Sequence, residues 1–175
     1  MLEVTDLKPS SIRIAGIVRE SIVDGPGIRF TIFCQGCPHG CEGCHNPDTH
    51  DFAGGYDCDI KKILDAIDSN PLLSGVTFSG GEPMCQPEAF LVLAEEIKKR
   101  KLDIVVFSGY TFEELLELKK RRPAIGKLLD IVDYLIDGKF VKSEKDLTLR
   151  FRGSKNQRII NLEKSRISGE LVVEE

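Results

Sequence analysis

The sequence predicts an α/β fold, organised as an incomplete parallel (βα) barrel. Short apolar runs alternate with segments of helical periodicity along most of the chain, and strands separated by helices usually pair in parallel. Segments rich in glycine, serine or cysteine follow directly after four of the apolar runs. The chain has 175 residues, whereas a complete (βα)8 barrel usually needs at least about 200. An open, partial barrel therefore suits the length, and a doubly wound sheet is the alternative.

Five apolar runs are predicted as strands because they are short, rich in Val, Ile or Phe, and bounded by turn residues. They are residues 12–18, 28–33, 76–78, 104–107 and the run within 130–137. These strands belong to a core of about residues 12–140. From about residue 147 to residue 175 polar and apolar residues alternate, so we expect a β-rich C-terminal tail. No linker or repeat interrupts the sequence, so we expect residues 1–175 to form a single domain.

Three helices are predicted between the strands. Asp59 precedes a run in which isoleucine and leucine recur on one helical face, and this helix should end at the Ser-Asn-Pro of residues 69–71. Pro87 fits the first turn of a second helix. Thr111 and Glu114 have the spacing of a capping box, which opens a third helix.

The composition is that of an ordinary soluble globular protein, with 41% hydrophobic and 30% charged residues. The net charge of −4 argues against a nucleic-acid binder. The basic runs at 98–101 and 119–122 lie at predicted helix ends, where cations are favoured. The sequence shows no leader and no apolar run long enough to span a membrane, so we expect a cytoplasmic protein. Cytoplasmic thiols stay reduced, which disfavours a disulfide framework.

Four unusual segments lie at the predicted carboxyl ends of strands. They are the cysteine-rich loop at 34–46, SGGEP at 79–83, SGY at 108–110 and DGK at 137–139. In parallel α/β folds the carboxyl ends of the strands form the face on which active sites are built. The sequence therefore predicts one site to which all four segments contribute.

The loop CQGCPHGCEGCHN gathers four of the six cysteines. A structural zinc site is one interpretation, but its two Cys-x-x-Cys pairs, which begin at Cys34 and Cys41, are usually farther apart than the three residues found here. An iron–sulfur cluster is the other. Cys37, Cys41 and Cys44 have the spacing Cys-x3-Cys-x2-Cys, and three thiolates would leave one iron of a 4Fe–4S cluster open to another ligand. The interspersed glycines let the loop bend closely around such a cluster.

These motifs together resemble the radical S-adenosylmethionine (SAM) enzymes. DGPGIR at 24–29 ahead of the cysteine loop is similar to the activases of glycyl-radical enzymes. The short length and the tail FRGSKNQRII at 151–160 look like the activating proteins of anaerobic ribonucleoside-triphosphate reductase. The resemblance runs from about residue 12 to residue 160. The cysteine triad alone is moderately specific, whereas the triad, DGPGIR, SGGEP and GSKNQRII together are highly specific.

The resemblance implies a radical SAM type of incomplete barrel and a defined chemistry. Cys37, Cys41 and Cys44 would hold one 4Fe–4S cluster, and SAM would chelate the open iron. Reductive cleavage of SAM would give methionine and a 5′-deoxyadenosyl radical. This radical would take a hydrogen atom from a glycine Cα of the glycyl-radical subunit of the reductase. Reduced flavodoxin or ferredoxin would supply the electron.

The resemblance also implies a set of SAM-binding residues. Gly80, Gly81 and Glu82 would provide hydrogen-bond partners for the SAM ammonium. Asn46 would lie near the cluster, although a turn residue before proline is an equally good interpretation. Ser108, Asp137 and Lys139 resemble positions that contact SAM in related activases. The donor-rich tail, including Arg152, Gln157 and Arg158, could meet the partner chain.

Other residues receive simpler interpretations. Cys34, Cys58 and Cys85 are expected to be buried thiols, and His39, His45 and His50 are expected not to be ligands. Many family members have an aromatic residue before the third cysteine, where this chain has Gly43, so adenine would be held by other residues. Arg29 either pairs with a carboxylate or is a surface charge.

Two alternatives remain beside the main hypothesis, and a third is rejected. The chain could activate another glycyl-radical enzyme, of which pyruvate formate-lyase is the nearest. A non-catalytic binding module clamped by zinc is an alternative of a different class. A dithiol oxidoreductase using Cys41 and Cys44 is disfavoured, because no thioredoxin-like sequence surrounds them.

Overall fold

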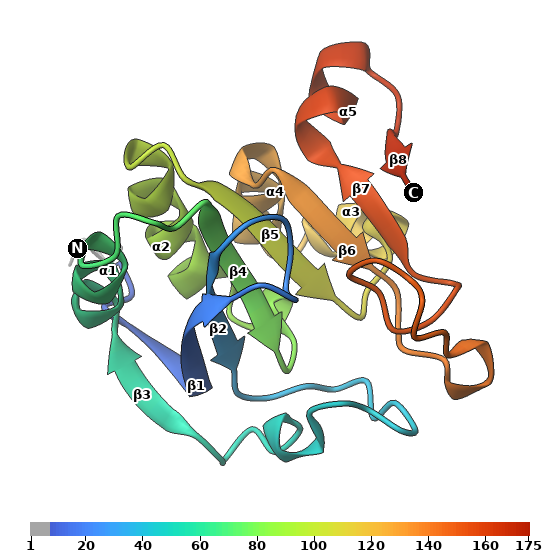
Figure 1. Cartoon of the computed structure of the whole chain (residues 1–175), viewed down its shortest axis with the longest axis horizontal. Helices are drawn as coiled ribbons and strands as arrows, with labels where there is room; N and C mark the ends of the chain where they lie inside the picture. Colours follow the sequence, from blue (N-terminus) through green and yellow to red (C-terminus); the bar gives the residue numbers. More distant parts are fainter. Residues whose placement is uncertain (1–7) are drawn as a thin grey trace, which may run out of the picture.

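A single eight-stranded sheet organises the computed structural model, which describes residues 8–175 (Figure 1). The order of the strands is β3-β1-β2-β4-β5-β6-β7-β8. Their bounds are β1 Ser11–Ser21, β2 Arg29–Cys34, β3 Tyr56–Asp59, β4 Gly75–Gly80, β5 Asp103–Ser108, β6 Tyr134–Asp137, β7 Arg158–Asn161 and β8 Val173–Glu174.

The sheet is mixed and open, so the α/β class is confirmed whereas an all-parallel, barrel-like sheet is not. The central strands β2, β4, β5 and β6 are parallel. The outer strands pair antiparallel, β3 with β1 and β1 with β2 on one side, and β6 with β7 and β7 with β8 on the other. β1 reaches β2 through the short turn of DGPGIR, and such a short connection can join only antiparallel neighbours.

Within the described residues, five α-helices accompany the sheet: α1 Ile60–Asp68, α2 Pro87–Lys99, α3 Phe112–Leu118, α4 Pro123–Ile131 and α5 Leu162–Ser168. The three predicted helices are present as α1, α2 and α3. The capping box is confirmed, because Thr111 Oγ1 accepts a hydrogen bond from Glu114 N and the Glu114 carboxylate accepts one from Thr111 N. Among residues 8–175, no helix combines the length and hydrophobicity required to cross a membrane.

The tail differs from its β-rich expectation because it contains α5 between the short strands β7 and β8. Asn161 caps this helix by accepting a hydrogen bond from Lys164 N, and Gly169 ends it in the left-handed conformation at φ 75°. Leu162 is the only residue of α5 that is buried. The sequence of α5 therefore shows too little apolar periodicity at helical spacing for the helix to be predicted.

The two faces of the sheet are covered differently. The main core joins one face to the helices and includes Phe78, whose ring lies 4.6 Å from that of Phe90 in α2. The other face carries a smaller cluster built on Val105, Ile136 and Ile159. This second face has space for a cavity, which the next section describes.

Arg29 fixes the DGPGIR turn to the second face. Its side chain is completely buried, and its Nη2 lies 2.6 Å from Asp103 Oδ1 at the start of β5. Its Nε donates to Thr77 Oγ1 and its Nη1 to Pro26 O, at 2.8 and 2.9 Å. Of the two interpretations of Arg29, the structure therefore shows the pairing with a carboxylate.

Candidate functional site

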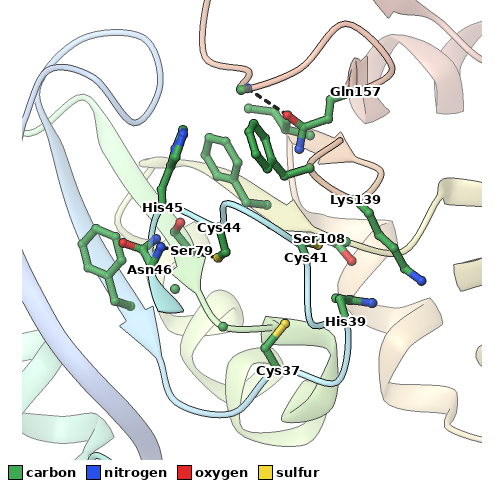
Figure 2. Close-up of a pocket in the computed structure, with 18 of the residues that line it drawn as sticks. Cys37, His39, Cys41, Cys44, His45, Asn46, Ser79, Ser108, Lys139 and Gln157 are labelled. Atoms are coloured by element: carbon green, nitrogen blue, oxygen red, sulfur yellow. Dashed lines mark hydrogen bonds between the residues drawn. The ribbon is translucent and has the colours of Figure 1, made fainter. Parts of the chain in front are cut away.

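The carboxyl ends of the four parallel strands meet around one cavity, as the sequence predicts. Cys34 at the end of β2 pairs with Gly80 at the end of β4, and Ser108 pairs with Asp137 at the ends of β5 and β6. The segments that follow these strands enclose a cavity of about 480 Å3 (Figure 2). This volume is in the range of small-molecule sites.

The floor of the cavity is formed by side chains just before the strand ends. They come from the second face of the sheet and are Phe33, Ser79, Phe107 and Ile136. Successive side chains of a strand point to opposite faces, so this set follows from the strand positions. The rim includes Val23 and Asp24 after β1, and Gly153 and Gln157 from the tail.

The cysteine loop is held to the sheet by backbone hydrogen bonds at its start. Gly36 N donates to Thr49 O at 2.8 Å, and Cys37 N donates to His50 O at 3.2 Å. The Gln35 side chain donates to Asp48 O and Asp51 O at 2.9 and 2.7 Å. The loop therefore folds back on the short helix η1 Pro47–Thr49.

The three cysteines of the predicted cluster motif share the cavity. Cys37, Cys41 and Cys44 are half-buried and line it, with Asn46 on one side and Lys139 on the other (Figure 2). Among residues 8–175 no three His, Cys, Asp or Glu side chains already stand in a metal-binding arrangement. The loop nevertheless fits a cluster, because it presents three soft thiol donors to one cavity.

The other cysteines lie apart from this set. Cys34 is inaccessible to solvent and belongs to the core, as expected. Cys58 and Cys85 are half-buried rather than buried, so the expectation for them is wrong. All six cysteines are free thiols.

Burial governs the ionisation of several thiols. It raises the pKa of Cys37, with smaller contributions in the same direction from Glu82, Cys41 and Cys44. Burial likewise raises the pKa of Cys34 well above its ordinary value, and that of Cys85 to about 11. A metal centre must displace the Cys37 proton, so binding there is coupled to proton release.

Glu82 does not line the cavity; its side chain is buried and hydrogen-bonds to several of the surrounding segments. Its carboxylate is inaccessible to solvent and lies 2.7 Å from His39 Nε2. It accepts hydrogen bonds from Gly109 N at 2.7 Å and from Met84 N and Ser108 Oγ at 3.0 Å. The Glu82 side chain thus joins the cysteine loop to the segments after β4 and β5.

Gly80 and Gly81 line the cavity and allow a close approach between two loops. Gly81 N donates to Cys34 O and Glu82 N donates to Gly36 O, at 2.9 and 2.8 Å. A Cβ atom at position 81 would meet Gly36 O at 2.4 Å. Glycine is therefore needed at position 81.

The remaining predicted residues divide into two groups. Asn46, Ser108 and Lys139 line the cavity, although the Ser108 hydroxyl already donates to Glu82. Asp137 is 1% exposed and accepts hydrogen bonds from Phe112 N and from the guanidinium of Arg158. Its carboxylate therefore faces protein donors, and it anchors the start of the DGK segment.

Sequence reasoning missed several residues of the site. His39 was interpreted only as a non-ligand, yet it is the partner of Glu82. Phe140 lines the cavity beside Gly43, with its ring 5.1 Å from that of His45. Gln157, expected only as a contact for the partner chain, also lines the cavity, accepts a hydrogen bond from Gly153 N and donates one to Gly138 O. The sequence signal that pointed to Gln157 was the family resemblance of the tail at residues 151–160.

Fold and site together describe an α/β protein whose cysteine loop fits an iron–sulfur cluster. Consistent with this, residues 23–160 match the family described as "4Fe-4S single cluster domain". Three similar curated proteins are named anaerobic ribonucleoside-triphosphate reductase-activating protein. The Vibrio cholerae protein is 36% identical over 78% of this chain and 89% of its own length. The corresponding values are 37%, 78% and 89% for Pasteurella multocida, and 35%, 81% and 93% for Escherichia coli K12.

The chain belongs to the family of anaerobic ribonucleoside-triphosphate reductase-activating proteins. Among solved structures, QueE from Escherichia coli aligns with a TM-score of 0.46 and 18% identity. That alignment covers 58% of this chain and 54% of QueE. The fold of this chain is therefore defined by its own sheet topology.

Proposed function

We propose that the protein is a radical SAM activase that reductively cleaves SAM at a 4Fe–4S cluster and generates a glycyl radical on anaerobic ribonucleoside-triphosphate reductase. The observation that carries this proposal is the shared cavity of Cys37, Cys41 and Cys44 with the Gly-Gly segment after β4. Membership of the activating-protein family supports it. So does the match to a 4Fe–4S family.

The three cysteines are the residues that would hold the cluster. When bound, the cluster would supply the electron for reductive cleavage of SAM to methionine and a 5′-deoxyadenosyl radical, and this radical would take a hydrogen atom from a glycine Cα. The chain itself has to bind and orient SAM and exclude water. The apolar floor, which includes Phe33 and Phe107, serves to exclude water.

Five cavity residues are proposed to bind SAM directly. The backbone around Gly80 and Gly81 would meet the SAM ammonium, since glycine lets main-chain carbonyl groups approach a ligand closely. Asn46 would lie beside the cluster, and the Lys139 ammonium would attract the SAM carboxylate. The Ser108 hydroxyl, which also bonds Glu82, would face SAM from the end of β5.

Glu82 and Asp137 are proposed to act through their neighbours. Glu82 holds Ser108 and the cysteine loop in place. Asp137, fixed by Arg158, sets the direction in which the chain leaves β6 toward Lys139. Neither carboxylate needs to touch SAM in this proposal.

Further parts of the proposal concern the whole molecule. The open sheet would correspond to the incomplete barrel of radical SAM enzymes, within one domain spanning residues 1–175. The protein would act in the cytoplasm, with reduced flavodoxin or ferredoxin as electron donor.

Glycyl-radical formation tests the proposal. The anaerobically reconstituted protein is mixed with SAM, dithionite and the anaerobic reductase, and electron paramagnetic resonance is recorded. A glycyl-radical signal with methionine release is expected, and it should disappear for Cys41→Ala. Pyruvate formate-lyase serves as the comparison substrate. A radical on pyruvate formate-lyase but not on the reductase would contradict the assigned partner.

A further inference from the structure

A strongly basic segment stands out in an otherwise acidic chain. Residues 139–157, here called the basic hairpin, contain six basic and two acidic side chains, a net charge of +4, whereas the whole chain carries −4. The proposed function uses only Lys139 among these charges. The basic residues are Lys139, Lys142, Lys145, Arg150, Arg152 and Lys155.

The hairpin is folded rather than loose. Lys145 and Ser154 form an antiparallel bridge, Asp146 N donates to Gly153 O at 3.2 Å, and Lys155 N donates to Glu144 O at 3.0 Å. This pairing places Lys145 and Lys155 on neighbouring strands of the hairpin, and both are exposed. The positive charge is thus displayed from a defined backbone.

The basic hairpin lies against the cysteine loop. Lys142 Nζ is 3.1 Å from Glu42 Oε1, and the Phe140 ring packs on His45. Figure 1 shows the two segments side by side at the end of the molecule opposite α1. The hairpin is therefore the charged surface adjoining the proposed cluster.

An open depression between the two segments leads toward the thiols. It is lined by Glu42 from the cysteine loop and by residues 139–143 of the hairpin. His39, Cys41, Lys139 and Phe140 line both this depression and the main cavity. Cys41 therefore stands between the surface depression and the interior, so a carrier seated there would approach the cluster from outside while SAM occupied the cavity.

We propose that the basic hairpin is the docking surface for an acidic one-electron carrier protein. This inference rests on the proposed function, in which the cluster must be reduced for SAM to be cleaved. The carrier loses one electron and the cluster gains it, with no bond made or broken. Lysines grouped around the approach would attract a negatively charged carrier and orient it.

The reductase is the competing occupant of this surface. It has to deliver a glycine into the main cavity, whose lining includes the exposed Val23 after β1. A carrier, in contrast, needs to reach only the outer side of Cys41. The position of the hairpin beside Cys41 therefore favours the carrier.

The test uses the double variant K145E/K155E, which leaves Lys139 and the Lys142–Glu42 pair intact. The matched control is K61E/K62E, which reverses two exposed lysines of α1 at the other end of the molecule. Methionine release from SAM is measured without the reductase, driven either by reduced flavodoxin or by dithionite. Iron content and circular dichroism are recorded for each protein, and K145Q/K155Q provides a milder change if the double reversal disturbs folding.

Flavodoxin-driven SAM cleavage by K145E/K155E should fall about tenfold at low ionic strength. The deficit should shrink as salt is added, because salt screens exposed charges. Dithionite-driven cleavage and iron content should match the wild type, and K61E/K62E should behave as wild type with both reductants. K145Q/K155Q should show a smaller loss in the same direction.

An unchanged flavodoxin-driven rate in K145E/K155E would overturn the proposal. The proposal would also be overturned if K145E/K155E kept the flavodoxin-driven rate but, with dithionite as reductant, formed less glycyl radical on the reductase. The hairpin would then be a docking surface for the reductase. Flavodoxin binding, measured directly on the same proteins, tests the surface independently of catalysis. A wild-type protein that fails to cleave SAM with dithionite would instead contradict the proposed function.

Discussion

His39 Nε2 lies 2.7 Å from Glu82 Oε2, in a contact almost completely shielded from solvent. It joins the middle of the cysteine loop to the segment that follows β4. Because Glu82 also accepts hydrogen bonds from Gly109 N and Ser108 Oγ, the same carboxylate reaches the segment after β5. Three of the four segments around the cavity are thus connected through one buried side chain.

Replacing Glu82 should therefore destabilise the site as a unit. In Glu82→Gln one acceptor oxygen becomes an NH2 group, which cannot accept from the buried donors around it. We expect a loss of about 1–3 kcal/mol in the free energy of unfolding, from unsatisfied buried groups. Urea unfolding of the cluster-free protein measures it. Glu95→Gln, at an exposed position of α2, is the control, and equal stability of both variants would refute the role given to Glu82.

Single cysteine substitutions should separate the cluster ligands from the other thiols. Cys37→Ala, Cys41→Ala and Cys44→Ala should each abolish SAM cleavage, because each removes a ligand from the shared cavity. Cys34→Ala should retain most of the activity, since Cys34 is a core residue. Iron content and methionine release are measured after anaerobic reconstitution. An inactive Cys34→Ala beside an active variant of the triad would mean that the ligand assignment is wrong.

The cysteine loop and the segment after β4 lie so close at Gly81 that no side chain should fit between them. In Gly81→Ala the new methyl group would overlap Gly36 O, so the cysteine loop and the segment after β4 must separate. We expect a loss of about 1–3 kcal/mol in stability, which is typical of overpacking, together with weaker SAM binding. The control is Gly16→Ala, because a Cβ there has nothing within 4 Å. SAM titration followed by calorimetry would show equal affinities if the close approach did not matter.

Alkaline pH should destabilise the cluster-free protein, partly through Cys85. Burial raises the pKa of this thiol from 9.0 to about 11, so the folded state retains a proton that the unfolded chain loses. The stabilisation is therefore complete below pH 9 and is lost as the pH rises toward 11. In Cys85→Ala the free energy of unfolding should fall less steeply over this interval. An identical slope in wild type and variant would exclude the contribution of Cys85.

The alternation of strands and helices was predictable because each element carries its own local pattern. The run before the cysteine loop has apolar residues at alternate positions, Phe30, Ile32 and Cys34, and the capping box at Thr111 is complete within four residues. The direction of the outer strands was harder to predict from the sequence. That β1 and β7 run antiparallel to the strands they adjoin depends on how the connections at 22–28 and 138–157 fold, which the periodicity of the strands does not show.

The site was predictable where residues close in sequence act together. The cysteine spacing and the Gly-Gly segment after a strand are local, and the structure brings both to one cavity. Contacts across the fold were not predictable, such as Glu82 with His39 or Asp137 with Arg158. Glu82 and Asp137 both lie at or just after the end of a strand. The sequence pattern there does not distinguish a carboxylate that is free to bind a ligand from one that accepts hydrogen bonds from the protein.

In the proposed function, SAM reaches a cluster held by Cys37, Cys41 and Cys44. The most direct measurement is electron paramagnetic resonance of the anaerobically reconstituted, dithionite-reduced protein, with and without SAM. We expect a reduced 4Fe–4S signal that changes when SAM is added. A protein that takes up zinc but no cluster, or a cluster signal indifferent to SAM, would contradict it.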